Sequence, residues 1–141
     1  MNGRAFARIL FLMTVLGVVL GVGGCANPQR PPFIYEIPAG YKGWVSVQFY
    51  RPDCPEMATE GEKIVIKIPA GGKLCTGTPL GFGDAADEYY YVDAAGTRTD
   101  AKADVLQEHV AIEGTAPKNI FERFFVGTEA ELKNSPEPRS E

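Results

Sequence analysis

Apolar and polar residues alternate along two segments of this chain, and a period of two is typical of β-strands that bury one face. The segments are 44–50 and 63–68. The side chains expected in the core are Val45, Val47, Phe49, Ile64, Ile66 and Ile68, and Val65 is expected to point outward. The pattern therefore predicts two amphipathic strands that pack against a common core.

Four shorter apolar segments are further strand candidates: Phe33–Ile37, Tyr89–Val92, His109–Ile112 and Phe124–Val126. Turn-forming residues separate the strands at Pro38–Gly40, Gly61, Pro69–Gly72 and Asp93–Gly96. Short strands separated at such intervals by proline and glycine are typical of sandwiches and small barrels. We therefore predict an all-β fold, a single antiparallel β-sandwich of immunoglobulin-like or transthyretin-like size with little helix.

Helical signals are few. Thr128 and Glu131 have the spacing of a capping box, which predicts one short terminal turn of helix. The segment 101–107 fits either a short helix or a loop.

The first 25 residues combine a positive start, an apolar run and a cysteine. Arg4 and Arg8 precede the run Ile9–Val22, whose 14 residues are fewer than the roughly 20 that a spanning helix needs. The run ends in Val22-Gly23-Gly24-Cys25, which resembles the lipobox of a bacterial lipoprotein signal peptide. The resemblance implies that residues 1–24 are removed and that acyl chains on Cys25 hold the protein at a membrane.

Two other interpretations of this segment stay open. One is an uncleaved N-terminal anchor helix, and the other is ordinary signal cleavage after Ala26. Under the lipoprotein interpretation, several acyl chains give durable anchoring, whereas a single chain binds only marginally. Because Ala26 replaces the aspartate that favours inner-membrane retention, the resemblance implies an outer-membrane protein facing the periplasm if the host has two membranes.

Composition places the rest of the chain in one domain. Beyond residue 24 there are 117 residues, with a net charge of 12 minus 18, or −6. This acidic balance argues against nucleic acid as a partner. We assign 25–32 to the lipidated cysteine and a short proline-rich tether, 33–132 to the sandwich, and 133–141 to a disordered tail.

Three cysteines are present, and the lipobox accounts for Cys25. Cys54 and Cys75 remain, 21 positions apart, and paired cysteines of an exported domain usually form a disulfide. The alternative, a metal site, is disfavoured because two isolated cysteines without a CxxC pair or a second histidine cannot complete a tetrahedral shell. We predict the Cys54–Cys75 disulfide and no metal.

Three sequence islands carry a resemblance that covers most of the domain. They are Ile37–Val45, the discontinuous stretch from Val65 to Tyr91, and Phe124–Thr128. Together they resemble a family of short bacterial lipoproteins and exported domains of unknown function. The resemblance implies an exported β-domain and carries no catalytic residue with it.

Two aromatic residues, Tyr41 and Trp44, are the candidate contact surface. They flank a turn at the start of a strand, where they serve either as packing anchors or as a platform for sugar or peptide. Tyr89, Tyr90 and Tyr91 alternate along another strand, so at least one of them is expected to face outward.

No catalytic set is recognisable in the sequence. The one histidine, His109, stands beside Glu108 without a G-x-S-x-G nucleophile motif, so we interpret it as structural. Asp84, Asp87 and Glu88 lack the spacing of an EF-hand loop and are interpreted as solvated. No P-loop or dinucleotide motif is present, and we predict no cofactor.

These observations predict a membrane-anchored lipoprotein of the bacterial envelope that is not an enzyme. We expect a binding or structural module whose partners are the membrane, through Cys25, and an envelope protein. The alternative is an inhibitor or immunity protein that caps a toxic hydrolase in the periplasm, since an acidic face complements a basic enzyme.

Overall fold

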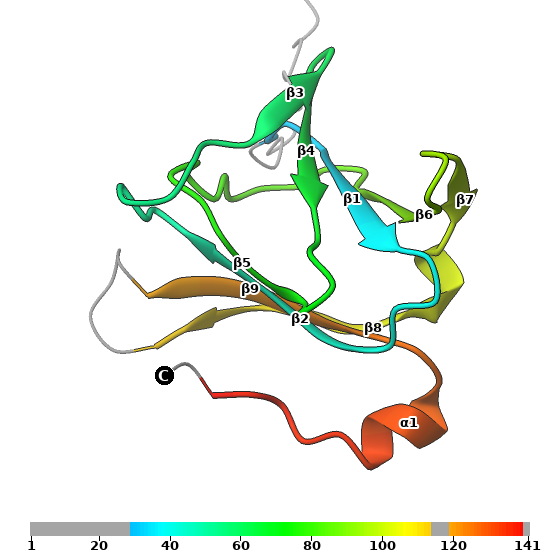
Figure 1. Ribbon diagram of the computed structural model, residues 1–141. Coiled ribbons are helices and arrows are strands. Elements are labelled where there is room, and N and C mark those ends of the chain that lie inside the picture. The colour runs from blue at the N-terminus through cyan, green and yellow to red at the C-terminus, as the bar shows by residue number, and fades with distance from the viewer. Residues whose placement is uncertain (1–28, 114–118, 140–141) are drawn as a thin grey trace, which may run out of the picture.

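The strand-forming segments pair into two sheets that face each other, as the computed structural model shows for residues 29–113 and 119–139 (Figure 1). The large sheet has the strand order β3-β4-β1-β6-β7 and the small sheet the order β5-β2-β9-β8. The large sheet comprises β1 (Phe33–Pro38), β3 (Ala58–Glu60), β4 (Lys63–Lys67), β6 (Glu88–Val92) and β7 (Arg98–Asp100). The small sheet comprises β2 (Gly43–Phe49), β5 (Lys73–Cys75), β8 (Val105–Ile112) and β9 (Ile120–Val126).

Two short helical elements complete the described structure. The 3-10 turn η1 (Lys102–Asp104) leads into β8, and the helix α1 (Glu129–Lys133) follows β9. Thr128 caps α1 by accepting from the Glu131 amide, while the Glu131 side chain accepts from the Thr128 amide. The predicted capping box is therefore confirmed.

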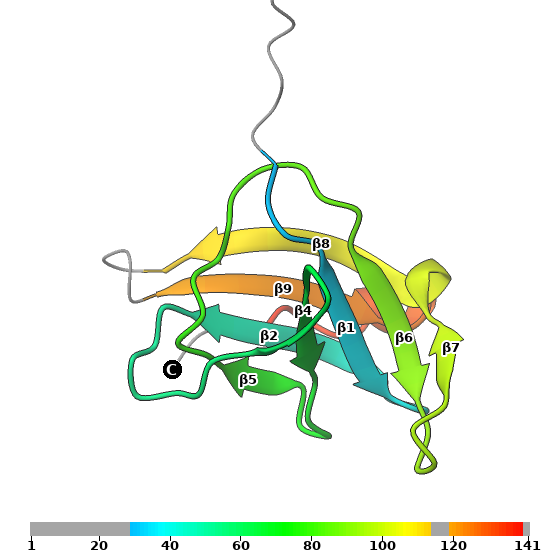
Figure 2. The same cartoon turned by 90° about the horizontal axis from the view of Figure 1, so that it is seen from above.

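The sandwich prediction is confirmed, but the sheets are mixed rather than purely antiparallel. Within the described residues, β1 runs parallel to both β4 and β6, and β2 runs parallel to β5. Parallel neighbours need crossover connections, and here the chain passes to the other sheet and back between them. Seen from above, the strands of the large sheet cross those of the small sheet (Figure 2).

The core fills the space between the sheets with the side chains that the alternation predicts. Tyr35 stacks on Tyr89 with ring centroids 4.7 Å apart, and Phe124 of the small sheet meets both rings edge-on. Such aromatic pairs contribute about 0.5–1.5 kcal/mol beyond their buried area. The expected core residues Val45, Val47, Phe49, Ile66 and Ile68 are all buried.

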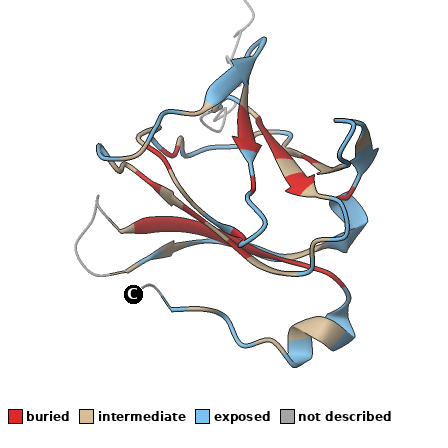
Figure 3. Cartoon of the chain, in the orientation of Figure 1, coloured by how far each residue is buried: buried red, intermediate tan, exposed pale blue. Residues whose placement is uncertain are grey.

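Val65 points away from the core, as the alternation predicts, because it lies outside the cluster that contains Ile66 and Ile68. It is nevertheless buried, with only 6% of its surface exposed. Ile64, expected in the core, is half-buried. Figure 3 shows the contrast between the buried centre of the molecule and the exposed β3 and β7 at the two edges of the large sheet.

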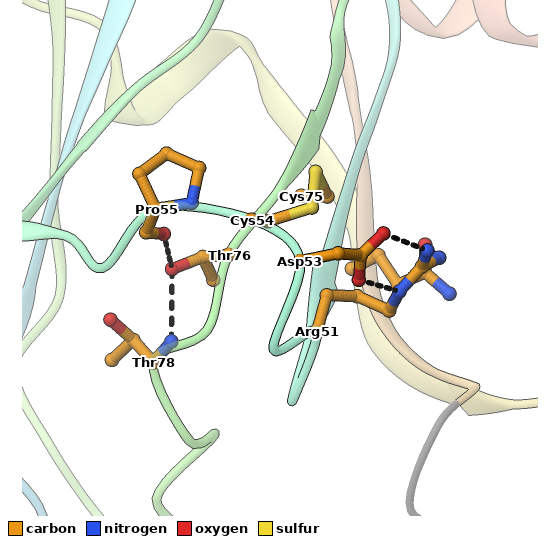
Figure 4. Close-up of a disulfide and its surroundings, with 8 residues drawn as sticks. Arg51, Asp53, Cys54, Pro55, Cys75, Thr76 and Thr78 are labelled. Carbon is orange, nitrogen blue, oxygen red and sulfur yellow. Dashed lines mark hydrogen bonds and ion pairs between the residues drawn. A yellow bond between two sulfur atoms is a disulfide. The ribbon is translucent and has the colours of Figure 1, made fainter.

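The predicted disulfide is confirmed. Cys54 and Cys75 are bonded with their Cα atoms 5.8 Å apart, which ties the loop after β2 to β5 (Figure 4). Thr76 strengthens the same junction: its hydroxyl donates to Pro55 O at 2.8 Å and accepts from the Thr78 amide at 3.0 Å. The edge strand β5 is thus held covalently as well as by its pairing with β2.

The signal segment and Cys25 lie outside the described residues. Among the residues that are described, no helix has both the length and the apolar content required to cross a bilayer. The described chain starts at Gln29, which pairs with Asp84 in an isolated parallel bridge. Four positions therefore separate Cys25 from the first residue placed against the domain.

Candidate functional site

The centre of the small sheet, β9, buries two adjacent residues of opposite charge. All seven residues of this strand are buried, and Glu122 and Arg123 are only 4% and 3% exposed. Because side chains alternate along a strand, Glu122 points between the sheets and Arg123 points to the outer face of the small sheet. Charged residues are rarely so deeply buried unless they are paired, so both sides of β9 are candidate sites.

On the inner side, three carboxylates converge. Oxygens of Asp87, Glu108 and Glu122 lie within 4.8 Å of one another, and we call them the inner cluster. The Tyr35 hydroxyl donates to Glu122, and the Tyr89 hydroxyl donates to Glu108. The large sheet thus supplies the phenolic donors and the small sheet supplies two of the three acids.

Two cations border the inner cluster. Arg30 forms a two-pronged ion pair with Asp87, whose Oδ1 also accepts from the Phe33 amide at 2.8 Å. Lys102 Nζ lies 3.5 Å from Glu108 and 4.1 Å from the centre of the Tyr89 ring. Each carboxylate of the cluster therefore has a donor of its own.

Burial raises the pKa of Glu122 to about 7. The hydrogen bond from Tyr35 opposes this shift, and the carboxylates of Glu108 and Asp87 add to it. Burial also raises the pKa of both Tyr35 and Tyr89 well above the usual range, so both phenols stay protonated and act as donors. With Glu122 protonated, two carboxylates face two cations and the cluster is close to neutral.

The inner cluster could offer oxygen ligands to a cation, since carboxylates are the ligands that calcium and magnesium prefer. Its members are already engaged by Tyr35, Tyr89 and Arg30, and we assign it no metal. The acids of the 84–88 loop do not act together. Asp87 turns inward to Arg30, whereas Glu88 pairs with Lys63.

On the outer side, Arg123 is held by two acids but is incompletely satisfied. Its Nη1 pairs with Glu113 and lies 3.4 Å from Glu137 Oε1, and the guanidinium lies 4.7 Å from the centre of the Phe121 ring. Among the described residues, its buried Nε–H has no hydrogen-bond acceptor. An unmet buried donor costs about 1–3 kcal/mol, so this guanidinium keeps an unused capacity to bind an oxygen.

Glu137 belongs to the C-terminal segment Ser135–Arg139, which follows α1 and runs across the outer face of the small sheet (Figure 1). Trp44 Nε1 donates to Ser135 O at 2.8 Å, and His109 Nε2 lies 3.0 Å from Glu137 Oε1. The polar composition of 133–141 predicts a disordered tail, but residues 133–139 make defined contacts with the sheet. The segment is ordered because it contacts the side chains of Trp44, His109 and Arg123.

Two cavities flank the C-terminal segment. The smaller one, about 310 Å³, is lined by Lys73, Arg123, Phe121, Pro138 and Arg139 together with parts of β2 and β5. The larger one, about 520 Å³, is lined by Trp44, Leu106, Pro136, Glu137 and residues of α1. We call this face, with its two cavities, the outer groove. The C-terminal segment fills it only in part.

A comparison with known protein families identifies the family of this chain. Residues 29–134 match the model of a family of unknown function, DUF6843. The chain belongs to that family. The resemblance seen in the sequence islands, to a family without an assigned activity, is confirmed to this extent, and the lipobox itself lies outside the matched region.

A solved structure has a fold similar to that of this chain. It is a crystal structure of a candidate lipoprotein from Bacillus anthracis, which is 24% identical, has a TM-score of 0.61, and covers 79% of this chain and 83% of its own. At this identity the likeness shows a common fold. The comparison with curated proteins gives no match.

Tyr41, one of the two predicted contact residues, is engaged within the chain. Its hydroxyl donates to Trp44 O at 2.6 Å. The ring is partly buried against the core and passes close to Gly72, where an added Cβ would lie 1.9 Å from the Tyr41 hydroxyl oxygen. Gly72 also has a φ of +70°, so both its conformation and this close approach favour glycine.

Trp44, the second contact residue, is half-buried in the outer groove. Its ring meets Phe125 and His109 edge-on, at 5.7 and 6.5 Å between centroids. His109 uses both ring nitrogens: Nδ1 lies 2.9 Å from Gln107 O, and Nε2 faces Glu137. Neither nitrogen is left to accept a proton from a hydroxyl.

The sequence patterns above do not single out Glu122 and Arg123 as candidate site residues, although one signal for them exists. The run Ile120–Val126 is apolar except for one adjacent pair of opposite charge. Such a pair inside a buried strand has to meet a partner on each face. The tyrosine run divides as expected: Tyr89 is buried, whereas Tyr90 and Tyr91 are partly exposed.

Proposed function

We propose that this chain is a lipid-anchored protein of the bacterial envelope that acts as a non-enzymatic binding module. The observation that carries the proposal is the order of Arg4, Arg8, the apolar run Ile9–Val22 and the Val22-Gly23-Gly24-Cys25 lipobox, followed within four residues by the folded unit. The shared fold with a candidate lipoprotein supports the same conclusion.

The disulfide supports export. Structural disulfides form and persist in oxidising compartments and are rare in the cytosol. Cys54–Cys75 is such a bond, and Cys25 is left for acylation. In a host with two membranes, Ala26 directs the protein to the outer membrane, with the domain facing the periplasm.

A binding role is favoured over catalysis by the state of the polar side chains. His109 has both nitrogens engaged, and the acids of the inner cluster each have a donor. The outer groove, in contrast, combines open volume with an unmet Arg123 donor. The inhibitor alternative gains no support from the 84–88 loop, because Asp87 and Glu88 are paired with different bases.

Metabolic labelling with a palmitate analogue tests the anchor. The wild-type chain should be labelled and should fractionate with membranes, whereas the Cys25→Ser variant should carry no label. Cys54→Ser is the matched control, because it removes a cysteine that does not receive lipid. Equal labelling of the wild type and Cys25→Ser would end the lipoprotein proposal.

A further inference from the structure

The outer groove already contains a peptide, namely the chain's own C-terminal segment. Its contacts define what the groove recognises. A backbone carbonyl accepts from the Trp44 indole, and a carboxylate meets Arg123 and His109. Pro136 lines the larger cavity and Pro138 the smaller one. The segment between them is extended, and each proline fixes its φ near −65°.

The segment is held by few contacts. Pro136, Glu137 and Arg139 are exposed, and the Glu137 side chain keeps 38% of its surface accessible. Partly exposed ion pairs such as Glu137–Arg123 are weak, and their strength falls with salt. Another peptide of the same chemistry can therefore compete with the C-terminal segment.

Charge favours an acidic competitor. Apart from Arg139, which belongs to the C-terminal segment itself, the described residues that line the smaller cavity include two cations of the small sheet, Lys73 and Arg123, and no carboxylate. The exported chain as a whole has a charge of −6, so this face is basic against an acidic background. A guanidinium binds carboxylates by paired N–H donors, and the Arg123 Nε–H is unmet.

We propose that the outer groove is a docking site for an extended, acidic, proline-containing segment of another protein, and that the segment Ser135–Arg139 occupies it in the absence of that partner. The partner places a carboxylate at Arg123 and a second one toward Lys73, and a backbone carbonyl at Trp44. This inference deepens the binding role proposed above by naming the partner's chemistry, and it does not depend on the lipid at Cys25.

The probe is a fluorescent peptide with the sequence of residues 133–139, capped at both ends, in which Lys133 and Arg139 are replaced by glutamate so that the peptide is acidic and carries a carboxylate toward Lys73. It is titrated onto the intact protein in detergent and onto the Glu137→Gln variant, and fluorescence anisotropy is measured. Glu137→Gln should bind the peptide about tenfold more tightly, because the tethered segment loses its charged hydrogen bonds and competes less well. A Glu-to-Gln version of the peptide should bind either protein more weakly.

Two further variants locate the site. Lys73→Gln, made in the Glu137→Gln background, should weaken binding several-fold. Lys67→Gln is the matched control, since it removes an exposed lysine of the large sheet and should change nothing. Arg123→Gln should abolish binding, and thermal unfolding shows whether that variant is folded; Lys73→Gln decides the question if it is not.

Absence of peptide binding to Glu137→Gln would overturn the proposal, as would equal effects of Lys73→Gln and Lys67→Gln. Sedimentation of Glu137→Gln gives a further check. A concentration-dependent dimer would assign the groove to the segment of a second copy and would also overturn the proposal. Failure of the palmitate labelling leaves this inference untouched, because the peptide experiment needs no anchor.

Discussion

Glu122 and Arg123 are neighbours in the sequence and are equally buried, yet they belong to regions of opposite character. Glu122 joins a closed network in which the phenols of Tyr35 and Tyr89 and the cations Arg30 and Lys102 meet the carboxylates. Arg123 lies in an open groove with an unmet donor and cavities on either side. One strand thus supports a structural network on its inner face and an exchangeable contact on its outer face.

The difference comes from what covers each face. The inner face of β9 is covered by the large sheet, whose strands are fixed by paired backbone hydrogen bonds. The outer face is covered by the segment Ser135–Arg139, which among the described residues has no backbone pairing to the sheet; its Ser135 carbonyl accepts from the Trp44 indole. Burial against a sheet leaves little freedom, whereas burial under one segment of chain can be reversed at a cost of few contacts.

The largest expected effect concerns the disulfide that braces β5 at the wall of the outer groove. Replacing Cys54 and Cys75 together by serine should lower the free energy of unfolding by about 3.4 kcal/mol, because the 21-residue loop is no longer closed in the unfolded chain. Urea unfolding measures the loss, and reduction of the wild type should reproduce it. A loss below about 1 kcal/mol would contradict the loop-entropy account.

The inner cluster should make stability depend on pH. The pKa of Glu122 rises from 4.5 to about 7 on folding, so the folded state holds the proton more tightly than the unfolded chain. Stability from this group is full below pH 4.5 and is lost as pH rises through about 7. The loss is about 3 kcal/mol at about 1.4 kcal/mol per pKa unit.

Urea unfolding between pH 4.5 and 8 tests this effect. Glu122→Gln cannot ionise and should remove the decline. The matched control is Glu131→Gln on the outer side, where Lys42 lowers the pKa of Glu131 to about 2. Glu131 stays ionised in the folded protein throughout this range and in the unfolded chain above about pH 6, so its replacement should leave the decline above that pH unchanged. The same slope in wild type and Glu122→Gln would disprove the assignment.

Removing the Tyr35 hydroxyl should lower the stability of the network around Glu122. Tyr35→Phe leaves Glu122 without its buried donor, which costs about 1–3 kcal/mol and raises the pKa of Glu122 further above 7. The loss should therefore be largest above pH 7. Tyr90→Phe, whose hydroxyl donates to the partly exposed Glu88, should change stability by less than about 0.5 kcal/mol. Similar losses in both variants would show that the inner cluster is no more stabilising than a surface contact.

The strands that show amphipathic alternation could be predicted from sequence, because periodicity is a local property. The strand around Trp44–Phe49 and the Cys54–Cys75 pair are examples. The three-residue strands β3, β5 and β7 are too short to show a period, and the full length of β9 was missed because charges interrupt its apolar run.

The candidate sites depend on contacts that local patterns do not encode. Tyr35 and Glu122 are 87 positions apart, and Trp44 and Ser135 are 91 positions apart. These contacts depend on which strands become neighbours in the sheets. Within the described residues, three of the strand pairings are parallel rather than antiparallel as expected. The sequence therefore marks Trp44 as a surface candidate but cannot name its partner.

The smallest expected effect is on the open side, at Trp44. Trp44→Phe keeps an aromatic ring but loses the indole donor to Ser135 O, which costs about 0.5–1.5 kcal/mol of local stability. Global unfolding should hardly change, while trypsin should cut after Lys133 roughly three to tenfold faster, because cleavage follows the opened population. Tyr91→Phe, which removes a hydroxyl contact to Asp104 away from the groove, is the control and should leave the cleavage rate unchanged. Equal cleavage in Trp44→Phe and wild type would mean that the indole does not hold the C-terminal segment, and the contrast between the closed and the open face of β9 would lose its kinetic support.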